Sequence, residues 1–173
     1  MGDFIHVSIA SRNPSVLVVN PAFAAKTFGE YVAYAKANPG KLTYASAGNG
    51  TSQHLAGELF KKMAGVNIVH VPYRGGAPAL NDLLGGHTAF MYASPATSAP
   101  HVQAGKLRAL AVTSARRSSV LPQVPTLAEK GVLNADTYSW IVLMAPGNTP
   151  RELVDQLNRE VHKALASPEV RAK

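Results

Sequence analysis

The sequence predicts a three-layer α/β fold built on a parallel sheet. Short apolar runs bounded by glycine or proline alternate with longer amphipathic segments from about residue 15 to residue 113, and this order is typical of a parallel sheet covered by helices. Apolar residues make up 46% of the chain and charged residues 16%, as in compact globular proteins. A length of 173 residues is enough for one domain or two small lobes.

The first strand is expected at residues 15–20, a continuous apolar run between Pro14 and Pro21 that reads as buried on both faces. Thr27 and Glu30 form a capping box that opens a helix ending at residues 38–40. A second strand at 42–46 leads into a helix over residues 52–64. Its inward stripe is expected to be Leu55, Leu59 and Met63.

The same unit recurs twice. A strand at 67–71 is followed by a turn at 74–78, with Pro78 as the first residue of a helix that ends at Gly85 and Gly86. A strand at 88–93, a helix at 94–104 and a strand at 107–113 complete the series. In such sheets ligands bind at the carboxyl ends of the strands, where the glycine turns fall.

Beyond residue 113 the pattern loosens. A second capping box joins Thr126 to Glu129, a strand is expected at 138–145, and a third box at Thr149 and Glu152 opens a helix with an apolar stripe. That stripe comprises Leu153, Leu157, Val161 and Leu165, and it needs a surface to lie on. Residues 169–173 read as the first turn of another helix, so we expect further sequence beyond the C-terminus.

Composition excludes several classes of protein. The formal charge of +7 favours anionic partners, but the lysines and arginines are scattered, so nucleic acid is not predicted. The absence of cysteine excludes disulfides and thiolate metal sites, and the dispersed histidines have no metal spacing. No apolar run reaches the roughly 18 residues that span a bilayer, and the first residues do not read as a signal peptide.

A glycine-rich turn gives the main functional signal. The strand at 42–46 turns through Gly48 and Gly50 into a helix, whose first N–H groups and dipole form a cradle for a carboxylate or phosphate. Gln53 stands where a dinucleotide motif needs its third glycine, and no Gly-Lys-Ser/Thr follows, so nucleotide binding is disfavoured. The alternative to ligand binding is a purely structural role, as a strand-to-helix turn with an N-cap.

Six ordered blocks of sequence resemble the Bug-type periplasmic solute-binding receptors of tripartite tricarboxylate transporters. The blocks are GNGTSQHL at 48–55 with Glu58, HVPYRG at 70–75 with PAL at 78–80, DLLGG at 82–86, GKLRALAV at 105–112, PQVPTLAE at 122–129, and Trp140 with AP at 145–146 and TP at 149–150. They lie in the same order between residues 48 and 150.

The resemblance implies a type II periplasmic-binding-protein-like fold of which this chain carries mainly the second lobe, at residues 20–136. Residues 1–19 are then a lead-in and crossing strand, and 137–173 a return crossing strand with part of the first lobe, which is largely missing. The strands expected to cross are 15–19 and 138–143. Such receptors hold an organic acid or amino acid in a cleft, lie in the periplasm, and serve the membrane components of the transporter, without a cofactor or catalysis.

The expected ligand-binding residues are the turn amides and hydroxyls of the second lobe, with one side-chain cation. They are Ala47, Gly48, Asn49, Gly50, Thr51, Ser52, His54, Arg74, Gly75, Gly76, Ala77 and Ser94. Many members carry an acidic residue where this chain has Ala93, which favours a plain carboxylate over an amino acid. Val142 replaces a frequent glycine and leaves the geometry of that crossing strand open.

Two other functions stay open from the sequence. One is a small hydrolase or transferase that uses Ser52 or His54, although no acid stands in place for a triad and no G-x-S-x-G elbow occurs. The other is a module that binds nothing and serves assembly. For a receptor half-site we expect at best millimolar affinity, and a second copy covering the surface left by the missing lobe.

Overall fold

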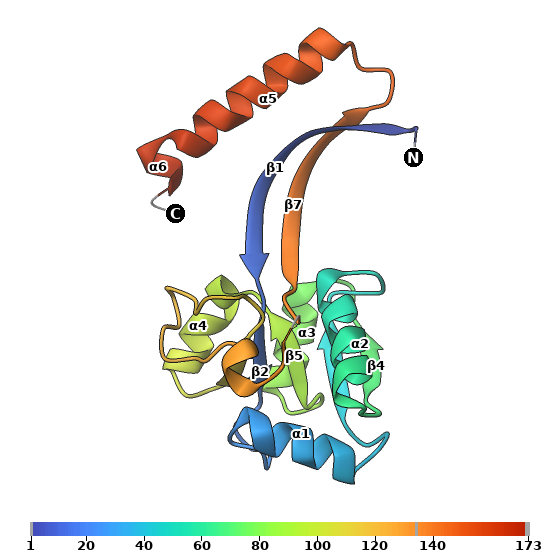
Figure 1. The fold of residues 1–173 in the computed structure, drawn as a ribbon, viewed down its shortest axis with the longest axis vertical. Helices are drawn as coiled ribbons and strands as arrows, with labels where there is room; N and C mark the ends of the chain where they lie inside the picture. Colours follow the sequence, from blue (N-terminus) through green and yellow to red (C-terminus); the bar gives the residue numbers. More distant parts are fainter. Residues whose placement is uncertain (1, 134, 172–173) are drawn as a thin grey trace. The chain divides into compact units, whose positions relative to one another are not determined.

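The computed structural model describes residues 2–133 and 135–171. The chain forms two compact units, a smaller one from Met1–Asn13 and Trp140–Lys173 and a larger one from Pro14–Ser139 (Figure 1). Each unit therefore has its own packing and is described by itself. Among the described residues, no helix is long and apolar enough to cross a membrane.

The larger unit is built on a mixed five-stranded sheet. The strand order is β4 (Val69–Pro72), β3 (Thr43–Ser46), β5 (Phe90–Ala93), β2 (Val16–Val19), β6 (Arg108–Val112). Strand β3 runs parallel to β4 and β5, whereas β2 is antiparallel to both β5 and β6. The predicted parallel sheet is therefore confirmed for β4, β3 and β5, and the antiparallel pairing of β2 makes the sheet mixed. Apolar periodicity reports burial but not direction, and β2 pairs only with strands far along the chain.

Helices cover both faces of this sheet and give the expected three layers. One core lies between the sheet and α1 (Phe28–Ala37) and α2 (Ser52–Ala64), and includes Leu17, Tyr31, Tyr44, Phe60 and Phe90. The opposite core lies beneath α3 (Gly76–Leu84) and α4 (Pro95–Gln103), and includes Val16, Leu83, Met91 and Ala99. All four residues of β2 are fully buried, as the two-faced apolar run predicts.

Helix α1 begins as its capping box predicts. The Thr27 hydroxyl accepts from the Glu30 N–H at 3.2 Å, and the Glu30 carboxylate accepts from the backbone N–H of Lys26 at 2.8 Å. The aromatic ring of Tyr31 then packs between Phe60 and Phe90, with ring centroids 5.3 and 5.0 Å away. The cap and this buried aromatic face together fix α1 against the sheet.

Helix α2 has the predicted bounds but not the predicted buried face. Leu55 and Met63 are 58% and 39% exposed, and the residues that face the sheet are Ala56, Gly57 and Phe60. The small residues at 56 and 57 allow the helix to lie close on the ring of Tyr44. The periodicity predicted the wrong face because Leu55, Leu59 and Met63 are more hydrophobic than Ala56 and Gly57. Leu59 and Met63 instead lie along a small cavity, together with Tyr92 and Leu127.

Two further element boundaries differ from expectation. Helix α3 begins at Gly76, so Pro78 is its third residue and not its first. The second capping box does form, with the Thr126 N–H donating to Glu129 Oε2 at 2.9 Å and the Glu129 N–H to the Thr126 hydroxyl at 3.0 Å. It opens only one 3₁₀ turn, η1 (Ala128–Lys130), because Gly131 at φ 83° ends it.

The smaller unit consists mainly of a two-stranded sheet and a helix. Its sheet pairs β1 (Phe4–Pro14) with β7 (Tyr138–Pro146), so residues 4–14 are a strand where only a lead-in was expected. Helix α5 (Arg151–Ala166) starts at an N-cap of Pro150 without a side-chain hydrogen bond, so the third capping box does not form. The single turn of α6 (Pro168–Arg171) follows.

Little of the smaller unit is buried. Val7, Ala145 and Val154 form its core, and Asn158 Nδ2 donates to the Val7 carbonyl at 2.6 Å. The apolar stripe of α5 is largely uncovered, with Leu153 at 50% and Leu157 at 43% exposure.

Candidate functional site

A cavity opens where the carboxyl ends of β3, β4 and β5 meet the first turns of α2, α3 and α4. Its volume is about 380 Å³, and its lining residues are Ala47, Gln53, Gly76, Ala77, Leu80, Met91, Ala93, Ser94 and Thr97. All of these belong to the larger unit. The cavity therefore lies at the edge of the sheet where ligands of open α/β folds bind.

Four of the twelve expected ligand-binding residues line this cavity, namely Ala47, Gly76, Ala77 and Ser94. The other eight do not line it: Gly48, Asn49, Gly50, Thr51, Ser52, His54, Arg74 and Gly75. Sequence reasoning missed Gln53 and Thr97, the polar residues that complete the lining. Gln53 lies in the first turn of α2 and Thr97 in the first turn of α4. These positions are the signal that could have found them, because helices that start at this edge of the sheet face the same space.

Two backbone amides of the cavity are available to a ligand. Within the described residues, the N–H groups of Gly76 and Ala77 donate to no protein acceptor, and the N-cap Gly75 supplies no side chain for capping. The N–H of Gly75 itself donates to the Ala47 carbonyl at 3.1 Å. Free N–H groups in the first turn of a helix attract anions.

The turn at residues 48–51 is closed by its own hydrogen bonds. The N–H of Gly48 donates to the Ser46 hydroxyl at 3.1 Å, and the N–H of Gly50 to His54 Nδ1 at 3.1 Å. The Thr51 hydroxyl donates to the Gly48 carbonyl at 2.7 Å and caps α2 by accepting from the His54 N–H at 3.4 Å. In this conformation the amides of Gly48 and Gly50 are occupied within the protein.

The amide of Ala47 is likewise engaged, because its N–H donates to Gln53 Oε1 at 2.7 Å. This contact ties the end of β3 to the first turn of α2. Gly48 at φ 135° and Gly50 at φ 77° have backbone conformations that residues with a side chain rarely adopt. The turn therefore joins two residues that line the cavity, Ala47 and Gln53, without lining it itself.

Side chains near the turn do not form a catalytic triad. Ser46 is fully buried and its hydroxyl lies 2.6 Å from His70 Nε2, out of reach of a substrate. Glu58 accepts from the Tyr44 hydroxyl at 2.9 Å and pairs with Lys61, so it does not orient an imidazole. Within the described chain, no hydrogen bond joins Ser52 to His54.

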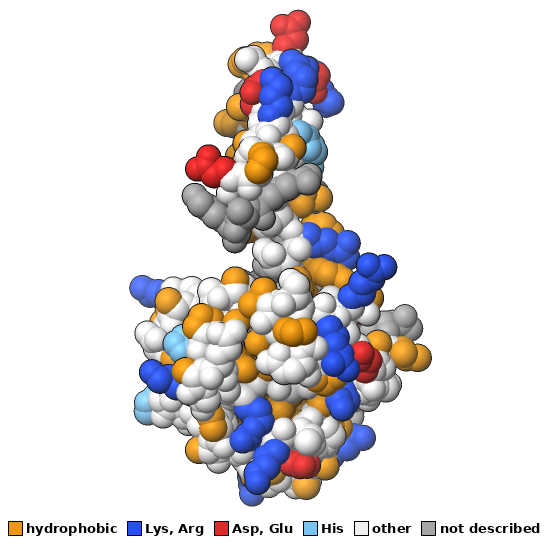
Figure 2. Space-filling view, turned by 90° about the vertical axis from the view of Figure 1, so that its left-hand side faces the viewer, with side chains coloured by type: hydrophobic (Ala, Val, Ile, Leu, Met, Phe, Trp, Pro, Cys, Tyr) orange, Lys and Arg blue, Asp and Glu red, His pale blue; other side chains and the backbone are white. Residues whose placement is uncertain are grey.

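Among the residues that the structure describes, no ionisable side chain lines the cavity. Leu80, Met91 and Ala93 give it an apolar floor, and Arg74 is exposed outside it. An anion would therefore be held by amide dipoles and hydroxyls, beside a wall suited to hydrocarbon. On the face drawn in Figure 2, lysine and arginine side chains lie dispersed over the larger unit, as the sequence predicts.

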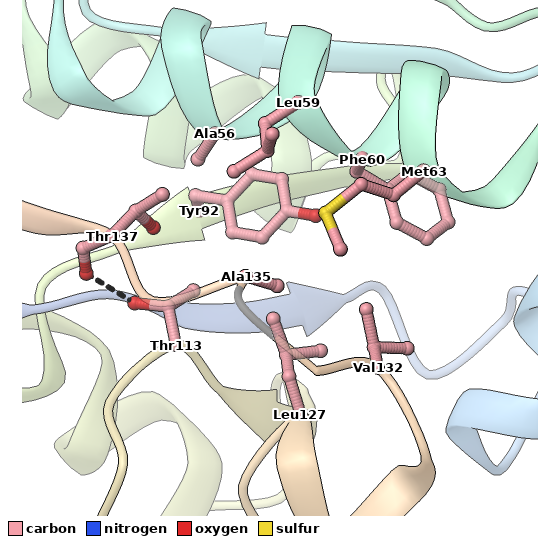
Figure 3. Close-up of a pocket in the computed structure, with 10 residues that line it drawn as sticks. All are labelled: Ala56, Leu59, Phe60, Met63, Tyr92, Thr113, Leu127, Val132, Ala135 and Thr137. Carbon is pink, nitrogen blue, oxygen red and sulfur yellow. Dashed lines mark hydrogen bonds between the residues drawn. The ribbon is translucent and has the colours of Figure 1, made fainter.

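A second cavity lies beneath α2 but is too small for a metabolite. Leu59, Phe60, Met63 and Tyr92 lie along it in Figure 3, and its volume is about 10 Å³. That space is comparable to one water molecule. The part of the chain that the structure describes contains no group of three His, Asp or Glu residues that could hold a metal ion.

Comparison with known proteins agrees with this architecture. The model of the family described as "Tripartite tricarboxylate transporter family receptor" matches residues 1–173. A UPF0065 protein from the tcbD-tcbE intergenic region of Pseudomonas sp. (strain P51) is 43% identical over 169 residues, covering 97% of this chain and 50% of that protein. The chain spans about half the length of the curated relatives it matches.

Three solved structures are similar over nearly the whole chain. Rpa4515 of R. palustris with adipate has a TM-score of 0.90 at 39% identity, covering 97% of this chain and 56% of that one. The periplasmic binding protein BugD has a TM-score of 0.90 at 32% identity, covering 98% and 56%. MatC of Rhodopseudomonas palustris with bound malate has a TM-score of 0.91 at 30% identity, covering 97% and 57%. Family model, sequence and fold agree, and the chain belongs to the Bug-type family of tripartite tricarboxylate transporter receptors.

Proposed function

We propose that this chain supplies the second lobe of an extracytoplasmic receptor that captures a small carboxylate for a tripartite tricarboxylate-type transporter. The observation that carries this proposal is the cavity of about 380 Å³ with the free amides of Gly76 and Ala77. The lobe binds and releases its ligand without chemistry and without a cofactor. Its partners are the ligand and the transporter's membrane components, and its compartment is the periplasm.

The lining favours a carboxylate with a hydrocarbon body. The amides bind the carboxylate of the ligand, while Leu80, Met91 and Ala93 contact its hydrocarbon body. A ligand amine would be desolvated without a counter-charge, because none of the described lining residues is acidic. Rpa4515 is solved with adipate and MatC with bound malate, and adipate has the unsubstituted chain that this floor suits.

One lobe alone binds weakly. A helix N-terminus contributes about 0.3 to 2 kcal/mol to a nearby anion and a charge-assisted hydrogen bond about 1.5 to 3, whereas micromolar affinity needs about 8. We therefore expect millimolar dissociation constants for adipate and malate, and weaker binding of aspartate. A sub-micromolar constant measured by calorimetry for this chain would contradict the half-site.

The amide of Gly76 can be removed with little disturbance. Gly76 is the first residue of α3, where proline is tolerated because the N–H has no helical partner, and an added Cβ would meet nothing within 4 Å. Gly76→Pro should abolish the chemical-shift changes that adipate causes at 75–77 and 94–97. The matched control Gly76→Ala keeps the N–H and should retain them. Equal binding by both variants would exclude this amide as a ligand contact.

A further inference from the structure

Two histidines stack face to face beside the turn that precedes α2. The ring centroids of His54 and His70 are 4.2 Å apart, and their planes differ by 16°. The ring of Tyr44 also stacks on His70, at 4.8 Å. Both imidazoles are half-buried, and β3, β4 and α2 hold them in place.

Each imidazole supports one end of the Gly48–Gly50 turn. The lone pair of His54 Nδ1 accepts the Gly50 N–H at 3.1 Å. His70 Nε2 lies 2.6 Å from the Ser46 hydroxyl, which in turn accepts the Gly48 N–H at 3.1 Å. The first of these contacts requires His54 to carry no proton on Nδ1, because an imidazolium donates from both nitrogens.

Protonation therefore acts directly on the turn. A proton on Nδ1 of His54 would face the Gly50 N–H, so the hydrogen bond is lost and the ring must turn away. A positive charge at the first turn of α2 also opposes the helix dipole. Charge on both stacked rings is disfavoured, because like charges at this distance repel.

Among the described residues, the charged groups that act on His70, besides His54, are Glu58 and Lys61. Glu58, one turn along α2, favours an imidazolium, but it is shared between Lys61 at 2.9 Å and the Tyr44 hydroxyl at 2.9 Å. Burial, and next the nearby His54, lower the pKa of His70 below its usual 6.5. A lowered histidine pKa means that the neutral form stabilises the fold above pH 6.5, and that this contribution is lost as the pH falls.

We propose that His54 and His70 are positioning residues that couple ligand binding to pH, with protonation of His54 releasing the Gly50 amide and opening the turn. The coupling to binding rests on the proposed function, because the turn lies between Ala47 and Gln53, which line the cavity and bond to each other. Binding weakens on acidification by about fivefold, the weight of one ordinary hydrogen bond.

The first test needs no ligand. Nitrogen-15 NMR follows the His54 ring and the Gly50 amide while the pH is lowered in steps from about 7.5 to about 5.5. The Gly50 amide should shift and exchange faster in step with protonation of His54. His54→Asn places a non-titrating acceptor near the position of Nδ1 and should remove this change, whereas His162→Asn, on the exposed face of α5, should leave it. If the chemical shift and exchange rate of the Gly50 amide do not change with protonation of His54, the proposal is overturned.

The second test measures adipate affinity over the same pH range. The affinity of the wild-type chain and of His162→Asn for adipate should fall about fivefold on acidification, whereas the affinity of His54→Asn should not change with pH. Binding that strengthens on acidification, or an equal slope in His54→Asn, would contradict the coupling. Absence of adipate, malate and aspartate binding at every pH would instead count against the proposed function, while the ligand-free experiment still decides whether the histidines hold the turn.

Discussion

Gly57 of α2 lies directly against the ring of Tyr44 of β3, so closely that a Cβ atom on Gly57 would overlap the tyrosine Cε2 and Cζ atoms. Tyr44 is fully buried and its hydroxyl donates to Glu58 on the same helix. The ring therefore cannot move aside easily. The position of α2 over the sheet, and with it one wall of the cavity, depends on the absence of a side chain at 57.

Gly57→Ala should destabilise the larger unit by up to about 2 kcal/mol, because overpacking costs about 1 to 3 kcal/mol and the gain in helix propensity is about 1 kcal/mol. Urea unfolding followed by circular dichroism measures the difference. Gly29→Ala in α1 is the control, because nothing lies within 4 Å of its added Cβ, and it should be neutral or stabilising. An unfolding midpoint for Gly57→Ala at or above that of the wild type would refute the close contact.

The Tyr73 hydroxyl donates to Asp82 Oδ2 at 2.5 Å and ties the turn after β4 to α3. Burial, then the hydrogen bond to Asp82, raise the pKa of Tyr73 to about 12. Because this folded pKa exceeds the unfolded value of about 10, the contact stabilises fully below pH 10 and is lost as the pH rises through 12. Asp82→Asn should lower the pKa of Tyr73 towards 10, as tyrosinate absorbance would record.

Tyr73→Phe identifies the titration step and should cost about 1 kcal/mol of stability, since the pair is partly exposed. If the absorbance step near pH 12 persists in Tyr73→Phe, another tyrosine is responsible for it.

Glu129 closes its capping box and also accepts from Arg117 Nε at 3.0 Å. The backbone N–H of Thr126, and next the Arg117 side chain, lower the pKa of Glu129 below 4.5. The ionised carboxylate thus supports this turn above pH 4.5, and the support is lost as the pH falls. Carbon-13 NMR should show the pKa rising in Arg117→Gln and unchanged in the neighbouring control Arg116→Gln. Equal values in both variants would exclude the ion pair as a cause.

Local pattern predicted the elements well, but not the direction of β2 or the buried face of α2. The two-faced burial of residues 16–19 follows from their apolar run, whereas the antiparallel pairing of β2 depends on strands about 70 to 95 residues away. The bounds of α2 follow from the turn at 48–51, but its buried face does not, because Gly57 and Ala56 carry little hydrophobic signal.

The candidate site was likewise predictable only in part. The alternation of strands and helices, with glycine turns at the ends of the strands, predicted the edge where the cavity lies. Which amides remain free is decided by side chains such as Gln53, Ser46 and His54, which satisfy the turn at 47–50 and leave Gly76 and Ala77 open. Such choices depend on side-chain geometry that composition and periodicity do not encode.

The α5 stripe gives the last prediction, that two copies of this chain associate through their smaller units. Leu153 and Leu157 are half-exposed on one side of α5, and burying each is worth about 1 kcal/mol. The double variant Leu153→Gln with Leu157→Gln should therefore weaken association at least about tenfold. Gln156→Ala with Arg159→Ala, which changes exposed polar residues of the same helix, should leave it unaltered. Light scattering over a dilution series measures both, and a wild-type chain that stays monomeric at every concentration would rule out the second copy as the cover of this surface.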